Sequence, residues 1–216
     1  TALGADAVTA AKIADDAISE EHLDATVITG MTELAAEPAD TDEFLISDAG
    51  TLKRIDYSHI KGGGITVADS WRLTANASIS GDSQLTANWE RTDTYGFGQL
   101  GTGMTESSGT FTFPSTGIYF VQFETSCNAS GAARTYIGAR IFTTTNNSSY
   151  NQASFSYNSA YQSGAYGSPM ASFIFDVTDT STHKVRVYGD TSGAVAYEGA
   201  TNEDKTCVRF IRLGDT

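Results

Sequence analysis

The chain of 216 residues is poor in cysteine and histidine and has no long apolar segment. Two cysteines, Cys127 and Cys207, are too few for the disulfide framework of a small secreted scaffold. The three histidines, His22, His59 and His183, are scattered and form none of the short spacings that transition-metal sites use. No segment reaches the roughly 18 apolar residues of a transmembrane helix. The sequence therefore predicts no membrane insertion.

Basic side chains are also scarce. Thirteen Lys and Arg residues stand against 26 Asp and Glu residues, which gives a net charge of −13. Residues 1–64 contain 13 of the acidic residues and 4 of the basic ones, so most of the excess charge lies in the first third of the chain. This balance excludes binding to nucleic acid through a basic surface, and we interpret the acidic part as a solvated stalk.

Glycine, serine, threonine and short aromatic runs are abundant, which is typical of an all-β protein. Residues 109–125 are the clearest case and read as strand, turn and strand. Phe111 and Phe113 alternate with threonines, which is the period of a half-buried strand. Residues 114–117, Pro-Ser-Thr-Gly, predict a tight turn because proline fixes φ and glycine accepts a positive φ.

The strand after this turn is apolar on both faces. Ile118 and Phe120 fall on one face. Tyr119, Val121 and Phe123 fall on the other. An antiparallel strand in an isolated sandwich is expected to have one solvated face. The second apolar face therefore indicates a contact outside the sandwich, and another copy of the chain is the simplest partner.

The pattern Phe-x-Phe-Pro-x-x-Gly-x-Tyr-x-x-x-Phe at residues 111–123 resembles the signature of the trimeric complement-subcomponent and tumour-necrosis-factor (TNF) jelly-roll superfamily. Later apolar segments follow in the order of that family's strands, at residues 135–143, 170–177, 184–188 and 207–213. The resemblance covers residues 69–216. It implies an all-β fold with a ten-stranded, TNF-like jelly-roll head, and a homotrimer of identical chains.

The same resemblance divides six residues between the sandwich core and the trimer axis, without deciding which face is which: Ile118, Tyr119, Phe120, Val121, Phe210 and Ile211. It also pairs the strand at 118–123 with the final strand, which brings Cys127 and Cys207 close together. A disulfide and two buried thiols are both open. Thiols are the expectation for a protein assembled in cytoplasm, where cysteines stay reduced.

Residues 6–29 contain a repeat of ten residues, in which residues 6–13 are echoed by residues 16–23 and residues 26–29 begin a third copy. Each unit predicts an extended pair of apolar residues, followed by a Thr or Ser hydroxyl that caps a single helical turn. So few apolar side chains cannot bury a core within one chain, so three chains are expected to share it. The pattern resembles the repeats of bacteriophage tail-fibre proteins.

Residues 43–57 predict a hairpin, because two apolar segments flank Asp48-Ala-Gly50. A lone hairpin is marginal in water, so this segment is also expected to depend on neighbouring subunits. It is similar to segments found beside phage fibre repeats. Three glycines at 62–64 predict the boundary of the head. The expected domains are a trimeric stalk at 1–30, a hairpin collar at 31–64 and a head at 65–216.

Residues 146–168 carry no charge and set tyrosines among Ser, Asn, Gln and Gly. Tyrosine offers a large contact area at low entropic cost, and small polar residues supply adaptable hydrogen bonds. These residues are therefore candidates for contact with a receptor, for which a polysaccharide is one prediction: Tyr150, Tyr157, Tyr161, Tyr166, Asn158 and Gln162. The alternative interpretation is an ordinary strand with aromatic cross-strand pairs.

Acidic residues precede the final strand at Glu198, Glu203 and Asp204. In the resembled family, loops near the trimer apex sometimes hold calcium, which prefers several oxygen ligands. A solvated loop is the other interpretation and the one we expect, so the sequence predicts no metal and no cofactor.

Residues 81–83, Gly-Asp-Ser, match the nucleophile block of GDS esterases. The nearest candidate for the base of that family is the pair Asp179 and His183, which has one residue too many between its members and lies in a predicted turn. We therefore expect no enzyme. Together the features predict the carboxyl-terminal part of a phage tail fibre, assembled with other tail proteins of the virion, that attaches to the host surface. A purely structural fibre of the tail or capsid is the alternative.

Overall fold

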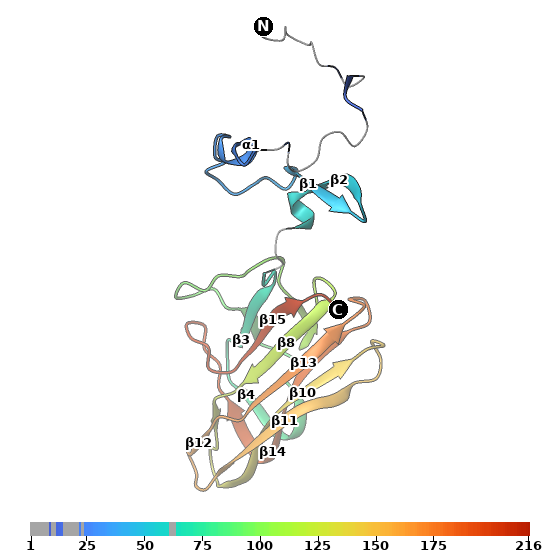
Figure 1. Cartoon of the computed structure of the whole chain (residues 1–216). Coiled ribbons are helices and arrows are strands. Elements are labelled where there is room, and N and C mark those ends of the chain that lie inside the picture. The colour runs from blue at the N-terminus through green and yellow to red at the C-terminus, as the bar shows by residue number, and fades with distance from the viewer. Residues whose placement is uncertain (1–8, 10–11, 15–21, 23, 61–63) are drawn as a thin grey trace. The chain divides into compact units, whose positions relative to one another are not determined.

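The computed structural model describes residues 9, 12–14, 22, 24–60 and 64–216 (Figure 1). The chain divides into two compact units, residues 1–62 and residues 63–216. Across the described part of the chain, no helix is long and apolar enough to cross a membrane.

The described residues of the first unit include a short α-helix, α1 (Thr26–Thr29). This helix includes the Val-Ile pair of the third repeat, so the prediction of an extended pair is wrong for this copy. Asp24 Oδ1 accepts the backbone N–H of Thr26, two residues on, at 2.9 Å, and this side-chain turn precedes the apolar pair. Most of the first two repeats lies outside the described residues, so the trimeric stalk stays a prediction.

The predicted hairpin is present as β1 (Glu43–Asp48) and β2 (Thr51–Asp56), followed by a 3-10 turn, η3 (Tyr57–His59). Asp48 pairs with Thr51, so the loop consists of Ala49 and Gly50 alone. Both loop residues have positive φ, at 50° and 84°, as a two-residue hairpin turn requires. All six residues of β1 are exposed, including a phenylalanine, a leucine and an isoleucine.

The second unit is an antiparallel sandwich of two sheets (Figure 1). Its strands are β3 (Ala68–Leu73), β4 (Ala77–Gln84), β5 (Trp89–Arg91), β6 (Thr105–Ser107), β7 (Thr110–Thr112), β8 (Gly117–Glu124), β9 (Cys127–Asn128), β10 (Arg134–Thr144), β11 (Asn151–Ala160), β12 (Tyr166–Gly167), β13 (Met170–Val177), β14 (Lys184–Tyr197) and β15 (Cys207–Gly214).

One sheet has the order β13-β8-β15-β3-β5, and the other runs β11-β10-β14-β7-β6, with β4 and β9 also paired to β14. The eight strands of six or more residues form the jelly roll, and this confirms the predicted fold class. The head was expected to have ten strands. The described residues contain more because five of the strands in this unit are pairings of only two or three residues.

The core is aromatic where the two sheets face each other. Phe111 and Phe113 are buried, as their alternation predicts. Phe111 contacts Phe210 with ring centroids 5.2 Å apart, and Phe113 contacts Tyr119 at 4.6 Å. The Tyr119 hydroxyl donates to the carbonyl of Ser115 at 3.0 Å, and this bond ties the turn before β8 to the core. Trp71 in β3 and Trp89 at the start of β5 are partly buried and pack against the same cluster.

Pairing in the five-stranded sheet decides which residues face the core. Tyr119, Val121 and Phe210 are fully buried between the sheets. Their neighbours Ile118, Phe120 and Ile211 alternate with them and lie half-exposed on the outer face. Cross-strand pairing places four apolar residues in one row on that face: Ile174, Phe120, Ile211 and Ala68. The row crosses four strands, and Ile174 is 60% exposed.

Both cysteines are buried and free. Cys207 pairs with Glu124 in the β8–β15 ladder, and Cys127 begins β9 a few residues later along the chain. Of the two alternatives left open by the sequence, the structure therefore contains the thiols and not the disulfide.

Candidate functional site

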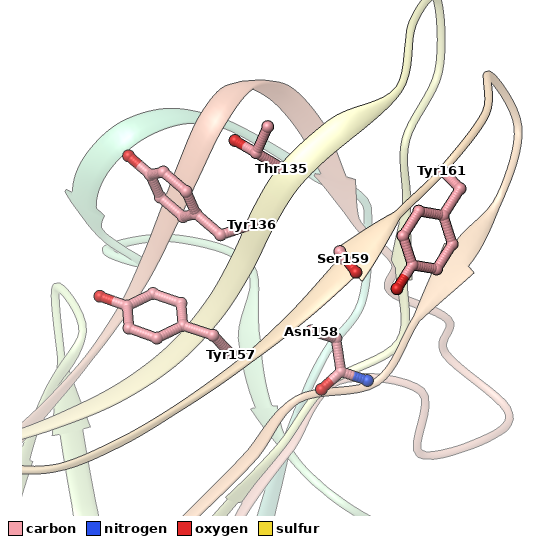
Figure 2. A pocket seen from close by; sticks show the side chains of 6 residues that line it. All are labelled: Thr135, Tyr136, Tyr157, Asn158, Ser159 and Tyr161. Atoms are coloured by element: carbon pink, nitrogen blue, oxygen red, sulfur yellow. The ribbon is translucent and has the colours of Figure 1, made fainter.

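A hollow of about 500 Å³ lies where β10 and β11 run together near residues 135 and 160 (Figure 2). Side chains of three tyrosines and three small polar residues line it: Thr135, Tyr136, Tyr157, Asn158, Ser159 and Tyr161. The lining therefore combines aromatic rings with hydroxyl and amide groups and contains no charged side chain. Figure 2 shows Tyr136 and Tyr157 pointing the same way, with Tyr161 on the other side of Ser159 and Asn158.

The strands set these positions. A register shift between Arg134 and Ile137 interrupts the β10–β11 ladder, which is the signature of a β-bulge. Beside this irregularity the consecutive residues Thr135 and Tyr136 are both exposed, although neighbours in a regular strand point to opposite faces. The bulge therefore lets two neighbouring side chains of β10 reach the same hollow.

Tyr157 is fixed by its neighbours on three sides. Its ring meets Tyr136 edge-on, with centroids 5.5 Å apart and an interplanar angle of 80°, which is a favoured geometry for aromatic pairs. The ring of Phe155 lies 5.4 Å away on the same strand. The Tyr157 hydroxyl donates to Asp190 Oδ2 at 2.8 Å. This hydrogen bond raises the pKa of Tyr157, so the hydroxyl stays protonated and acts as a donor.

The carboxylate of Asp190 is also held by a charge pair. Arg140 Nη1 lies 3.4 Å from Asp190 Oδ2 and 2.9 Å from Asp82 Oδ2. Arg140 lies on β10 opposite Tyr188 of β14. Its guanidinium carbon is 5.3 Å from the centroid of the Phe142 ring. The charged groups beside the hollow are thus already paired with one another within the protein.

The structure brings together three of the six predicted receptor contacts, namely Tyr157, Asn158 and Tyr161. Tyr150 immediately precedes β11, seven residues before Tyr157. Because an extended strand rises about 3.3 Å per residue, the two tyrosines are about 20 Å apart along the strand. The ring of Tyr150 packs under the guanidinium of Arg186 at 3.7 Å, and it does not line the hollow.

The remaining two candidates are exposed but belong elsewhere. Tyr166 lies in β12, which pairs with β9. Gln162 follows β11, and its carbonyl accepts the backbone N–H of Ala165 in a turn. Neither residue lines the hollow.

Sequence reasoning missed Tyr136, although this residue opens one of the apolar segments noticed in the chain. Alternation along β10 puts Tyr136, Gly138 and Arg140 on one face, and this was the available signal. Asp190 was missed as well. Its position opposite Gly138 depends on the pairing of β10 with β14, which no local pattern reveals.

The candidate calcium ligands each have a protein partner. Glu198 accepts from the Ser126 hydroxyl at 3.0 Å, and Asp204 accepts from the Thr92 hydroxyl at 2.9 Å. Glu203 lies 3.6 Å from the ammonium of Lys205. The part of the chain that the structure describes contains no group of three or more His, Cys, Asp or Glu side chains that could hold a metal ion.

The candidate esterase residues have structural partners of their own. Residues 81–83 lie within β4, where they pair with β14. Asp179 caps a turn by accepting the N–H and hydroxyl of Ser181 at 2.8 and 2.7 Å. His183 is buried, with its ring nitrogens near the hydroxyls of Thr178 and Thr182. Each group is thus used within its own turn or strand, which gives no support to the esterase alternative.

Known structures resemble the head. No family model and no curated protein matches this sequence. The crystal structure of murine APRIL at pH 5.0 superposes with a TM-score of 0.51 at 13% identity, over 68% of this chain and 98% of that chain. The structure of Eiger TNF from S. frugiperda superposes with a TM-score of 0.54 at 13% identity, over 69% of this chain and 94% of that chain. The head therefore has a TNF-like jelly-roll fold.

Proposed function

We propose that the chain is the distal part of a bacteriophage tail fibre, which attaches the virion to the host-cell surface by binding a receptor. The observation that carries this proposal is the tyrosine-lined hollow, built on two long strands and open to solvent. Tyrosines held by a rigid sheet lose little conformational entropy on binding, which suits a surface that captures a ligand. The resemblance of the amino-terminal repeats to phage fibres supports the viral assignment.

Assembly into a homotrimer is the second part of the proposal. The row of Ile174, Phe120, Ile211 and Ala68 places apolar side chains across four strands on the outer face of the five-stranded sheet. Apolar patches of this kind mark protein contacts more often than free surface. Leu100 and Leu213, both about half exposed, are further apolar side chains of the same unit. Two identical chains are the partners that fit this face, because TNF-like jelly-roll families assemble as trimers.

The face that we propose for assembly and the site that we propose for recognition belong to different sheets. The apolar row lies on one sheet of the sandwich and the tyrosine-lined hollow on the other. If the apolar rows meet around an axis, the three hollows point away from it. Three weak sites presented in this way bind a repetitive surface together, and avidity exceeds the affinity of one site by ~10²–10⁴.

Binding without catalysis is the mechanism we propose. The residues that line the hollow are tyrosine, threonine, serine and asparagine, which offer hydrogen bonds and stacking surfaces. A nucleophilic hydroxyl needs a histidine or carboxylate beside it to take its proton. Among the residues that line the hollow, the hydrogen bond from Tyr157 to Asp190 is the one contact of this kind. The arrangement holds a ligand and supplies no reaction.

A purely structural fibre is the second candidate, and one observation favours it. Tyr157 contacts Tyr136 on the neighbouring strand and Phe155 on its own strand, and such aromatic pairs stabilise a sheet without any ligand. In that case the hollow would have no occupant, and removal of its outermost ring would leave every property of the virion unchanged.

Binding to cells separates the two candidates. Fluorescently labelled full chain would be incubated with a panel of bacterial strains, and bound label measured by flow cytometry. Tyr161 is 88% exposed, so Tyr161→Ala removes contact surface without opening the core. Tyr95 is 86% exposed in the loop after β5, and Tyr95→Ala is the matched control. Attachment predicts binding to at least one strain that falls about tenfold in Tyr161→Ala and not in Tyr95→Ala. Equal binding of all three proteins favours the structural fibre.

A further inference from the structure

Three hollows adjoin one another along the β10–β11 pair. The hollow described above shares Tyr136 and Tyr157 with a second one of about 440 Å³, which Asp190 completes. On its other side it shares Thr135, Ser159 and Tyr161 with a third of about 340 Å³. The second and third hollows have no lining residue in common. The three therefore form a row, with the largest in the middle.

From this row we infer that the receptor ligand is a chain of sugars bound across several subsites, not a single terminal sugar. This inference rests on the proposed receptor function. Each hollow lies within or near the size range of small-ligand sites. Paired tyrosines divide the middle hollow from the one at Asp190, as a wall between successive units of a linear ligand would. A ligand that occupies only the middle hollow leaves both neighbours empty.

The polar groups favour a sugar chain over a peptide. The residues that line the middle hollow carry three phenolic hydroxyls, two aliphatic hydroxyls and one amide, and a sugar hydroxyl can pair with each kind of group. The Tyr157 hydroxyl already donates to Asp190, so it remains available only as an acceptor. Its aromatic rings offer faces and edges to the C–H side of a pyranose. The row also offers no deep apolar pocket to anchor a large apolar side chain, which a peptide ligand would need.

The charges favour an uncharged chain. No charged residue lines the middle hollow. At one end, Asp190 is held by the Tyr157 hydroxyl and lies 3.4 Å from Arg140. At the other end, the guanidinium of Arg134 donates to the carbonyls of Ala194, Ser130 and Ala133. The hydrogen-bonding groups of Asp190 and Arg134 are thus already used within the protein, so they offer few hydrogen bonds to an acidic or basic sugar.

Binding as a function of ligand length and charge tests the inference. Full chain would be titrated against neutral hexose and N-acetylhexosamine oligosaccharides of one to six units, and against uronic-acid oligosaccharides of the same lengths. We expect the affinity for a neutral series to rise by about tenfold or more from one unit to three or four, and then to level off, since each filled hollow adds contacts. We expect the acidic chains to bind more weakly.

The variants make the test specific to the row. Tyr136→Ala removes the wall between two hollows but leaves the third hollow in place, so the gain in affinity from short to long neutral chains should become smaller. Tyr136→Phe keeps the ring and should keep the length dependence, and unchanged circular dichroism of both variants would show that the sheet is intact. Tyr95→Ala should behave as the unmodified chain.

The outcomes are distinct. Equal affinity for one unit and for longer chains, or a preference for the acidic chains, overturns the inference. Absence of binding to every neutral series also overturns it. If the chain still binds bacterial cells in that last case, the receptor function stands and only the sugar assignment falls. If it binds neither cells nor sugars, the receptor function falls as well.

Discussion

The ring of Tyr157 lies on the backbone of Gly138, its partner across the β10–β11 ladder. A Cβ atom at position 138 would stand 2.5 Å from Cε1 of Tyr157, which is closer than atoms of this kind can approach. Glycine at this position therefore lets the tyrosine lie flat against the strand. In that position its hydroxyl reaches Asp190 and its edge meets Tyr136.

We predict that Gly138→Ala displaces the ring of Tyr157 and costs about 1–3 kcal/mol in the free energy of unfolding. Ligand binding should fall at the same time, although every tyrosine is still present. In a background with Tyr157→Ala the two closest contacts, at 2.5 and 2.8 Å, are gone and the carbonyl of Asp190 lies 3.1 Å away, so the cost of the same substitution should be smaller. Urea denaturation of the two single variants and the double variant measures this coupling. An equal cost in both backgrounds would show that the ring does not depend on the glycine.

Arg72 connects β3 to two loops from a fully buried position. Its Nε and Nη2 donate to Glu90 Oε1 at 2.9 and 2.7 Å, and Nη1 donates to the hydroxyl of Thr94 at 2.7 Å. Nη2 also donates to Asp93 Oδ1 at 2.6 Å and to the carbonyl of Thr201. One side chain thus fixes loops that are far apart in the sequence.

Loss of this side chain should destabilise the head. We predict that Arg72→Met lowers the free energy of unfolding by about 2 kcal/mol, because several charge-assisted hydrogen bonds disappear. The side chain of Asp93 is 72% exposed, so Asp93→Asn should change stability by less than about 1 kcal/mol. Thermal and urea denaturation of the two variants provide the comparison. Equal losses would mean that the exposed pair, and not the buried network, holds the loops.

The two thiols predict a loss of stability in alkaline solution. Burial raises the pKa of Cys127 and of Cys207 from 9.0 to about 12. Above pH 9 the unfolded chain releases thiol protons that the folded chain keeps. Each thiol should therefore lower the free energy of unfolding by about 1.4 kcal/mol per pH unit between pH 9 and 12, while its effect below pH 9 is absent.

Urea denaturation at pH 8 and pH 10.5 tests this effect. The variant Cys127→Ala/Cys207→Ala should lose less stability between the two pH values than the unmodified chain. Burial also raises the pKa of Tyr197, so the variant should retain part of the decline. The same decline with and without the cysteines would show that the thiols ionise as easily in the folded chain as in the unfolded one.

Alternation within a strand was predictable from sequence because it is a local property. The pattern at residues 111–123 correctly placed Phe111 and Phe113 in a buried position and separated Phe120 from Val121. Which face of β8 is the core was not predictable. That choice depends on Phe210 and Phe175, which reach β8 only through the pairing of strands that lie far away in the chain.

The candidate site was predictable only in part. Composition drew attention to residues 146–168, because tyrosine among small polar residues is a local signal, and three of the residues it singled out line the hollow. It could not show that a long extended strand carries Tyr150 away from Tyr161. Nor could it supply Tyr136 and Asp190, which join the site through a bulge in one ladder and the register of another.

The apolar row also makes a prediction about assembly. The substitution Ile174→Asp places a charge in the proposed contact between subunits. The variant should therefore dissociate at protein concentrations at which the unmodified chain is still a trimer. Phe155→Asp is the matched control, since Phe155 is 55% exposed and lies on the other sheet, while Ile174 is 60% exposed. Sedimentation velocity over a concentration series measures the difference. Equal behaviour of the two variants would remove the outer face of the five-stranded sheet from the assembly.

The mass of the full chain in solution, measured by light scattering, tests the central claim most directly. A strand with apolar side chains on both faces, and a hairpin with every residue of one strand exposed, predict that three copies supply one another's missing contacts. The expected mass is three times the 22.9 kDa of one chain. A mass of 22.9 kDa, with the outer row of Ile174, Phe120 and Ile211 left in solvent, would contradict the account.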